Sequence, residues 1–234
     1  MILSGLFSSV LFLAAFLLPA LSMSESLREV PAASRTPRSP TPSALERPRI
    51  VAFGDSLTSG LGVGAEEAYP AQLQRRLDAA GLRFRVINAG VSGDTTAGGL
   101  RRVAWALQSK PAVVILELGG NDGLRGLSLQ ETRVNLARII EEFRRASVTV
   151  VLAGMKLPPN YGAEYTAEFE SIYPALAKQY RLALIPFFLD KVAGSESLNQ
   201  ADGIHPTAAG YRLIVERVLE TLKPVLEKSA GSTK

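Results

Sequence analysis

Two short motifs, far apart in the chain, hold the side chains best suited to nucleophilic chemistry. The tripeptide Gly54-Asp55-Ser56 follows an apolar run, and a second motif near the carboxyl end contains His205, the single histidine of the 234 residues. Serine becomes a nucleophile when a base that titrates near neutral pH takes its proton, and among these side chains only His205 is of that type. Asp202 could hold the imidazole tautomer and stabilise the imidazolium. These residues predict acyl transfer by Ser56, His205 and Asp202.

Each motif also has a purely structural interpretation. Serine and glycine after a strand are ordinary turn formers. His205 is followed by Pro206, so this pair could simply begin the helix that comes next, because proline is favoured in the first turn of a helix. The joint presence of a serine at a strand end and one histidine with a nearby aspartate favours catalysis.

Four motifs together resemble a known family. Gly54-Asp55-Ser56-Leu57, an isolated Gly93, Gly119-Gly120-Asn121-Asp122 and Asp202-Gly203-Ile204-His205-Pro206 appear in the order of the four blocks of the GDSL, or SGNH, hydrolases. The resemblance covers residues 49–228. It is strongest to the bacterial subgroup of thioesterase I, protease I, lysophospholipase L1 and the arylesterases, which segments 117–126 and 157–162 resemble closely.

The resemblance implies a serine esterase or thioesterase that works through an acyl-enzyme without a metal or cofactor. It also implies an oxyanion hole made of the Ser56 and Gly93 backbone N–H groups and the Asn121 side-chain amide. Glycine at position 93 fits this role, because a residue without Cβ lets the backbone approach a substrate closely. Gly93 and Asn121 could instead be ordinary turn residues.

The expected partner is a small acyl ester or thioester, such as a lysophospholipid, an aryl ester or an acyl-CoA. Apolar loop residues could form a groove for the acyl chain: Leu124, Leu157, Pro158, Tyr161 and Ile204, with Leu127 beside them. Two alternatives stay open. One is a carbohydrate O-acetylesterase of the same family. The other is a flavodoxin-like binder that cradles a phosphate in the loop 56–60, although its loops lack the aromatics that a flavin would want.

Composition narrows the possible functions. The net charge is +4, but no basic stripe is interleaved with aromatic residues, so nucleic acid is not an expected partner. The absence of cysteine excludes disulfides, thiolate metal sites, a cysteine nucleophile and lipoprotein attachment. We expect a monomer whose contact with a membrane surface, if any, is weak.

The domain organisation is read from composition along the chain. Residues 1–22 are apolar and predict either a signal peptide cleaved after Ser22 or a retained membrane anchor, since about 20 apolar residues can span a bilayer. An exported protein, periplasmic or secreted, is therefore expected. Residues 23–48 are rich in proline, serine and arginine and predict a flexible linker. The hydrolase domain is expected at 49–228 and a disordered tail at 229–234.

The domain alternates strand-like and helix-like segments. We predict strands at 49–53, 84–88, 112–118, 148–154 and 182–186, and helices at 68–80, 94–108, 128–146, 165–180 and 207–227. Repeated βα units predict a three-layer α/β/α sandwich around a five-stranded parallel, flavodoxin-like sheet. The first helix should bury Leu73 and Leu77, and the third Val134 together with Leu136 and Phe143. Such a sheet would bring all the candidate catalytic residues to its carboxyl edge.

Overall fold

The structure is a computed structural model that describes residues 47–231. The predicted leader at 1–22 lies outside this range, and so does the linker up to residue 46. Within the described part, no helix combines the length and apolar character needed to cross a membrane.

Five parallel strands form one sheet in the order β2-β1-β3-β4-β5. Their bounds are Arg49–Gly54 (β1), Arg85–Gly90 (β2), Pro111–Glu117 (β3), Thr149–Ala153 (β4) and Ala183–Ile185 (β5). This is the flavodoxin-like order, in which ligands bind outside the carboxyl ends of the strands where the order reverses. The register aligns Gly54 with Gly90 on one side and with Glu117 on the other, so three strands end together.

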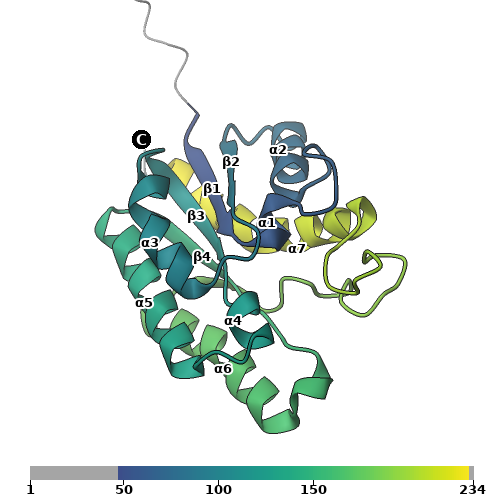
Figure 1. Ribbon diagram of the computed structural model, residues 1–234. Coiled ribbons are helices and arrows are strands. Elements are labelled where there is room, and N and C mark those ends of the chain that lie inside the picture. Colours follow the sequence, from purple (N-terminus) through teal and green to yellow (C-terminus); the bar gives the residue numbers. More distant parts are fainter. Residues whose placement is uncertain (1–46, 232–234) are drawn as a thin grey trace, which may run out of the picture. The chain divides into compact units, whose positions relative to one another are not determined.

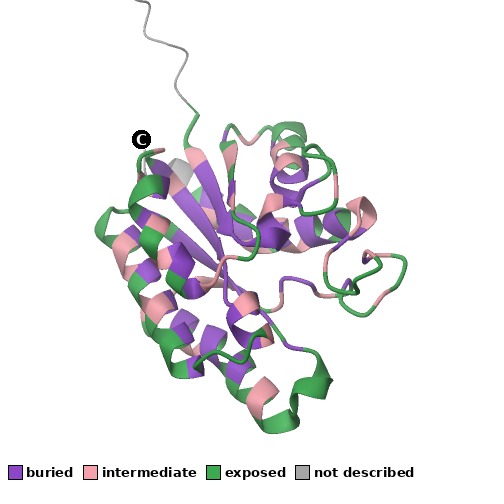
Figure 2. Cartoon of the chain, viewed as in Figure 1, coloured by how far each residue is buried: buried purple, intermediate pink, exposed green. Residues whose placement is uncertain are grey.

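Helices cover both faces of the sheet, which confirms the predicted sandwich (Figure 1). Helices α2 (Tyr69–Ala79) and α7 (Ala208–Gly231) lie on one face, and α3 (Thr96–Leu107), α5 (Leu129–Arg145) and α6 (Ala163–Tyr180) lie on the other. The central strands β1, β3 and β4 are rich in valine, isoleucine and leucine and are almost wholly buried (Figure 2). Such uninterrupted apolar strands are typical of a parallel sheet covered on both faces.

The helical periodicity placed most core side chains correctly. Leu73 and Leu77 are fully buried beneath α2, as predicted. The prediction for Val134 was wrong, because its side chain is 47% exposed. Helix α5 buries Leu136, Ile139, Ile140 and Phe143, which recur at helical spacing. Val134 precedes Leu136 by two positions, which turns it about 200° around the axis and onto the solvent face.

Three short elements had no counterpart in the predicted set. They are α1 (Ser56–Ser59), α4 (Gly120–Leu124) and the 3₁₀ turn η1 (Pro159–Tyr161). Each follows the carboxyl end of a strand, where the candidate site residues lie. Helix α7 also continues to Gly231, past the predicted domain end at 228, so the first residues of the predicted tail are helical.

Candidate active site

Ser56 is the first residue of α1, directly after β1. The helix is anchored at its start by Asp55, whose Oδ1 accepts from the Leu57 N–H at 3.0 Å. It ends at Gly60, whose φ of +83° lies in the left-handed region that favours glycine. Because α1 begins where β1 ends, Ser56 lies at the carboxyl edge of the sheet.

The predicted catalytic side chains form one hydrogen-bonded chain. Ser56 Oγ lies 2.8 Å from His205 Nε2, and His205 Nδ1 lies 2.7 Å from Asp202 Oδ2. The other oxygen of Asp202, Oδ1, accepts from the backbone N–H groups of Ile204 and His205 at 2.9 and 3.0 Å. The His205 N–H is the main reason that the pKa of Asp202 falls to about 2. The carboxylate therefore stays ionised through the physiological range.

The loop that carries His205 is fixed against the loop that follows α1. The Gln200 side chain donates to the Leu61 carbonyl at 2.8 Å and to the Pro206 carbonyl at 3.0 Å. The Gln200 backbone N–H donates to the His205 carbonyl at 2.7 Å, and Asn199 pairs with Pro206 in an isolated antiparallel bridge. These contacts join two segments far apart in sequence and hold the imidazole beside Ser56.

Gly93 lies on the loop that follows β2, and Asn121 lies in α4, the short helix that follows β3. Gly93 has φ +78°, and its carbonyl accepts from Arg125 at 3.0 Å. Among residues 47–231, neither the Ser56 N–H nor the Gly93 N–H donates to a protein acceptor. Asn121 Nδ2 donates to Asp55 Oδ2 and to the Asp94 carbonyl, each at 3.0 Å. Two backbone donors are thus free, and the Asn121 amide is held in a defined orientation.

Two aspartates brace these loops. Asp55 is 2% exposed, and burial raises its pKa to about 6 against the opposing hydrogen bonds from Leu57 and Asn121. Asp122 accepts from both the N–H and the hydroxyl of Thr96, at 2.9 and 2.5 Å, and so fixes the start of α3. Within the described range, no group of three or more His, Cys, Asp or Glu side chains is arranged to hold a metal ion.

A buried carboxyl beneath the nucleophile was not singled out from the sequence. Glu117 ends β3, is fully buried, and accepts from the Thr58 hydroxyl at 2.7 Å. It lies near the end of the predicted strand 112–118, whose other residues are apolar, so the apolar pattern does not indicate a site residue there. The signal that could have identified Glu117 is a single charged residue within a central strand, since buried carboxyl groups are rare.

A cavity of about 550 Å³ opens beside Ser56 and His205. Four of the residues named as candidates for an acyl groove line it, namely Leu124, Leu157, Pro158 and Ile204. Tyr161 does not line it, because its hydroxyl turns to donate to the Leu124 carbonyl at 3.0 Å; Leu127 is likewise absent from the lining. The sequence missed several apolar lining residues, which come from α1 and the loops after β4 and β5: Leu57, Met155, Phe187, Leu189 and Ala193.

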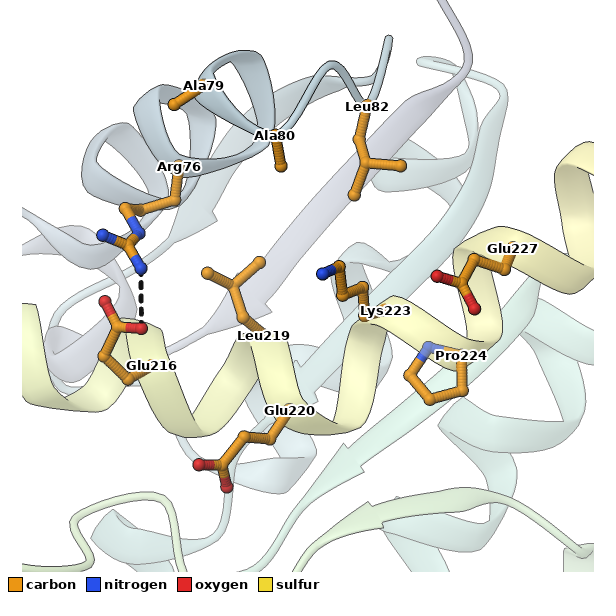
Figure 3. Close-up of a pocket in the computed structure, with 10 residues that line it drawn as sticks. All are labelled: Arg76, Ala79, Ala80, Leu82, Glu216, Leu219, Glu220, Lys223, Pro224 and Glu227. Carbon is orange, nitrogen blue, oxygen red and sulfur yellow. Dashed lines mark hydrogen bonds and ion pairs between the residues drawn. The ribbon is translucent and has the colours of Figure 1, made fainter.

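A second hollow lies between α2 and α7, at the opposite edge of the sheet (Figure 3). Arg76 and Glu216 form an ion pair of 2.8 Å across it, and Leu82, just before β2, helps to line it. None of the candidate catalytic residues reaches this hollow. The candidate residues Ser56 and His205 instead line the cavity at the carboxyl edge.

Comparison with known proteins agrees with this geometry. Residues 52–213 match the model of the GDSL-like lipase/acylhydrolase family. Esterase TesA of Pseudomonas aeruginosa is 46% identical over 178 residues, which are 76% of this chain and 89% of that protein. Thioesterase 1/protease 1/lysophospholipase L1 of Escherichia coli K12 is 38% identical over 178 residues, 76% of this chain and 84% of that protein. The crystal structure of TesA superposes with a TM-score of 0.73 at 45% identity, covering 75% of this chain and 98% of that one. The chain therefore belongs to the GDSL-like lipase/acylhydrolase family.

Proposed function

We propose that this protein is a serine hydrolase that cleaves acyl esters and thioesters through an acyl-enzyme. The observation that carries the proposal is the uninterrupted chain from Ser56 Oγ through His205 to Asp202, with contacts of 2.8 and 2.7 Å. A nucleophile, a base and a carboxylate that orients the base are the three parts that this chemistry needs. Because one chain supplies all three, we expect it to act as a monomer.

In the first step, Ser56 Oγ attacks the acyl carbonyl carbon while His205 Nε2 takes the hydroxyl proton. His205 then gives that proton to the leaving alcohol or thiol as the carbon–heteroatom bond breaks, and the acyl group remains on Ser56. Water attacks the acyl-enzyme in the second half, with His205 again the base. Asp202 stays ionised throughout and stabilises the imidazolium that forms twice in each cycle.

The negative charge of each tetrahedral intermediate needs donors set in advance. The N–H groups of Ser56 and Gly93 are unoccupied by protein acceptors in the described structure. Ser56 begins α1, and Gly93 lies on the loop after β2, which contacts α1 through the bond between Ser59 and Ser92. We assign Asn121 Nδ2 as the third donor, which would share or exchange its present bonds to Asp55 and Asp94 when the oxyanion develops.

The cavity beside Ser56 favours an acyl chain over a sugar. Its lining is mostly aliphatic, and Phe187 is the one aromatic ring besides the His205 imidazole. An enzyme that removes O-acetyl groups from carbohydrates is expected to stack the sugar on aromatic side chains and to bind its hydroxyls with many polar groups. This lining lacks that combination. Flavin binding is disfavoured for the same reason, since no flanking aromatic pair is present there. Lipid-derived or aryl esters are the substrate class that we propose.

Labelling with a fluorophosphonate tests the nucleophile directly. The wild-type protein should be labelled at Ser56, as mapped by mass spectrometry, and should hydrolyse p-nitrophenyl esters. Ser56→Ala should lose both properties, with turnover falling on the order of a thousandfold or more. Ser59→Ala is the matched control, because the hydroxyl of this second serine of α1 bonds to Ser92 and to the Ser56 carbonyl, whereas His205 bonds to the Ser56 hydroxyl. Labelling elsewhere, or an active Ser56→Ala, would remove the assignment.

We further infer weak contact with lipid surfaces through the rim of the cavity. Several of the loops at the carboxyl edge carry an exposed aliphatic side chain, namely Leu61, Val91, Leu127 and Ile204. Replacing Leu61 and Val91 by serine should reduce sedimentation with phosphatidylglycerol vesicles while hydrolysis of a soluble p-nitrophenyl ester is kept. Equal sedimentation of both proteins would contradict this inference.

We also infer that the protein is exported, on the composition of residues 1–22. The amino-terminal sequence of protein recovered from the periplasm or medium would test this. A mature chain that begins at Met23 is expected from a cleaved leader, and recovery of the intact chain in the membrane fraction would identify an anchor instead.

A further inference from the structure

The Glu117 side chain, at the end of β3, forms hydrogen bonds with residues on both sides of Ser56. Its Oε2 accepts from the Thr58 hydroxyl at 2.7 Å and from the Asp55 backbone N–H at 3.3 Å. Asp55 precedes Ser56, and Thr58 follows it within the same turn of α1. One oxygen on a central strand therefore ties down the short helix on either side of Ser56, a helix too short to be stable by its own hydrogen bonds.

The fold leaves room for this carboxyl at Gly54. Gly54 pairs with Glu117 in the sheet, and a Cβ placed on Gly54 would lie 2.4 Å from Glu117 Oε2 and 2.0 Å from Thr58 Oγ1. Both distances are far shorter than van der Waals contact. Because Gly54 has no Cβ, it leaves the space in which the Glu117 carboxyl reaches α1.

The surroundings of Glu117 disfavour a charge on it. The titratable groups that act on it are Asp55, Arg102 and the tyrosines Tyr69, Tyr173 and Tyr211. Burial raises the pKa of Glu117 well above its usual value, and Asp55 raises it further; the hydrogen bonds and Arg102 oppose this. Arg102 itself is engaged by Asp94 at 2.6 Å and by the Gly54 and Ala89 carbonyls.

The second oxygen of Glu117 gives independent geometric support. Within the described residues, Oε1 is buried and has no hydrogen-bond partner, and the same holds for the hydroxyls of Tyr69 and Tyr211. A full negative charge on a carboxylate with one bare, buried oxygen would carry a large desolvation penalty. A neutral carboxylic acid with its proton on Oε1 can still accept both hydrogen bonds at Oε2, and it avoids the cost of desolvating a charge.

We propose that Glu117 is a positioning residue that acts as a neutral acid, and that its Oε2 holds α1 so that Ser56 Oγ stays within hydrogen-bond reach of His205 Nε2. This proposal rests on the serine hydrolase function proposed above. The role requires an acceptor at Oε2 and no charge. Glutamine, which offers an uncharged carbonyl in the same place, should therefore replace glutamate, and an aliphatic residue should not.

Three variants and one control variant test this role. Glu117→Leu should lower kcat about 10- to 100-fold with KM nearly unchanged, because a displaced nucleophile affects the chemical step more than binding. Glu117→Gln should restore most of that loss. Thr58→Val removes one donor while keeping its shape, and should lower kcat in the same direction even if Glu117→Leu fails to fold. Thr58→Ser, which keeps the hydroxyl, is the matched control.

Two further readouts distinguish a neutral acid from a charged one. The infrared difference spectrum between wild type and Glu117→Gln should contain the carbonyl stretch of a protonated carboxylic acid. The acid limb of kcat/KM and the NMR titration of His205 should be the same in both proteins. The proposal would be overturned if Glu117→Gln were as impaired as Glu117→Leu, or if the acid limb of kcat/KM in Glu117→Gln moved to lower pH. Full activity in both Thr58→Val and Glu117→Leu would also overturn it. Fluorophosphonate labelling of Ser56 in wild type shows separately that the hydrolase function itself holds.

Discussion

At the scale of single residues, Asp202 combines two tasks through its two oxygens. Oδ2 meets the imidazole, while Oδ1 accepts two backbone N–H groups of its own loop. Asp202→Asn keeps a backbone acceptor but removes the charge and can present a donor to Nδ1, which favours the wrong tautomer. We expect kcat to fall on the order of 10³- to 10⁴-fold with the fold intact. Steady-state kinetics and circular dichroism check this, and a loss below tenfold would contradict the role.

Asn121 is a second residue whose contribution can be isolated. Its amide bonds to Asp55 and Asp94 hold the side chain in a defined orientation, and one of them is shared or exchanged when the oxyanion forms. Asn121→Ala should lower kcat about 100- to 1000-fold and leave KM nearly unchanged, as for a donor used mainly in the transition state. Asn160→Ala, on the exposed turn η1, is the control and should behave as wild type. A normal kcat in Asn121→Ala would make this residue part of the turn only.

At the scale of elements, the position of α1 depends on how closely β2 approaches it. A Cβ on Gly90 would lie 2.2 Å from the Ser59 backbone nitrogen, so Gly90→Ala must push the helix or the strand aside. We expect a loss of about 1–3 kcal/mol in the free energy of unfolding, together with a drop in kcat, because Ser56 moves with α1. Gly64→Ala is the matched control, since its Cβ would meet nothing closer than 3.4 Å. Urea unfolding and ester hydrolysis measure both effects, and two equally stable, equally active variants would contradict the expectation.

The elements also show what the sequence could predict. Apolar runs such as 112–116 and amphipathic periods such as that of α2 come from burial, which repeats along a segment, so the strands and long helices were predictable. Helices α1 and α4 are too short to display a period, and their positions depend on side-chain bonds to Asp55 and Glu117. The contacts among Ser56, His205 and Asp202 could be anticipated because nucleophilic serine chemistry needs these residue types. The cavity lining was only partly predictable, since Met155 and Phe187 reach it from loops whose paths are set by tertiary contacts.

At the scale of the whole molecule, stability and activity should depend on pH in opposite directions. The pKa of Asp55 is raised by burial from 3.8 to about 6, and that of Glu117 is raised well above its usual value. Stability that depends on a raised carboxyl pKa is fully present below the unfolded value and is lost as the pH rises through the folded value. The pKa of Asp202 is lowered to about 2, so its contribution is present above pH 3.8 and is lost only as the pH falls toward 2.

These three carboxyl groups place their joint optimum of stability in mildly acidic solution. If His205 is the base that we propose, it must be neutral to accept the Ser56 proton, so we expect hydrolysis to rise with pH. We therefore expect the free energy of unfolding to fall by on the order of 1–3 kcal/mol between about pH 5 and about pH 8 because of the buried pair. Urea titrations across that range measure it. Glu117→Gln should flatten the dependence by stabilising the protein more at the higher pH, and Asp78→Asn, at an exposed carboxylate, should leave the slope unchanged. An equal slope in wild type and Glu117→Gln would mean that folding does not change the protonation of Glu117 in this range, so that Glu117 is ionised in the folded protein as it is in the unfolded chain. The buried pair would then not set the pH dependence.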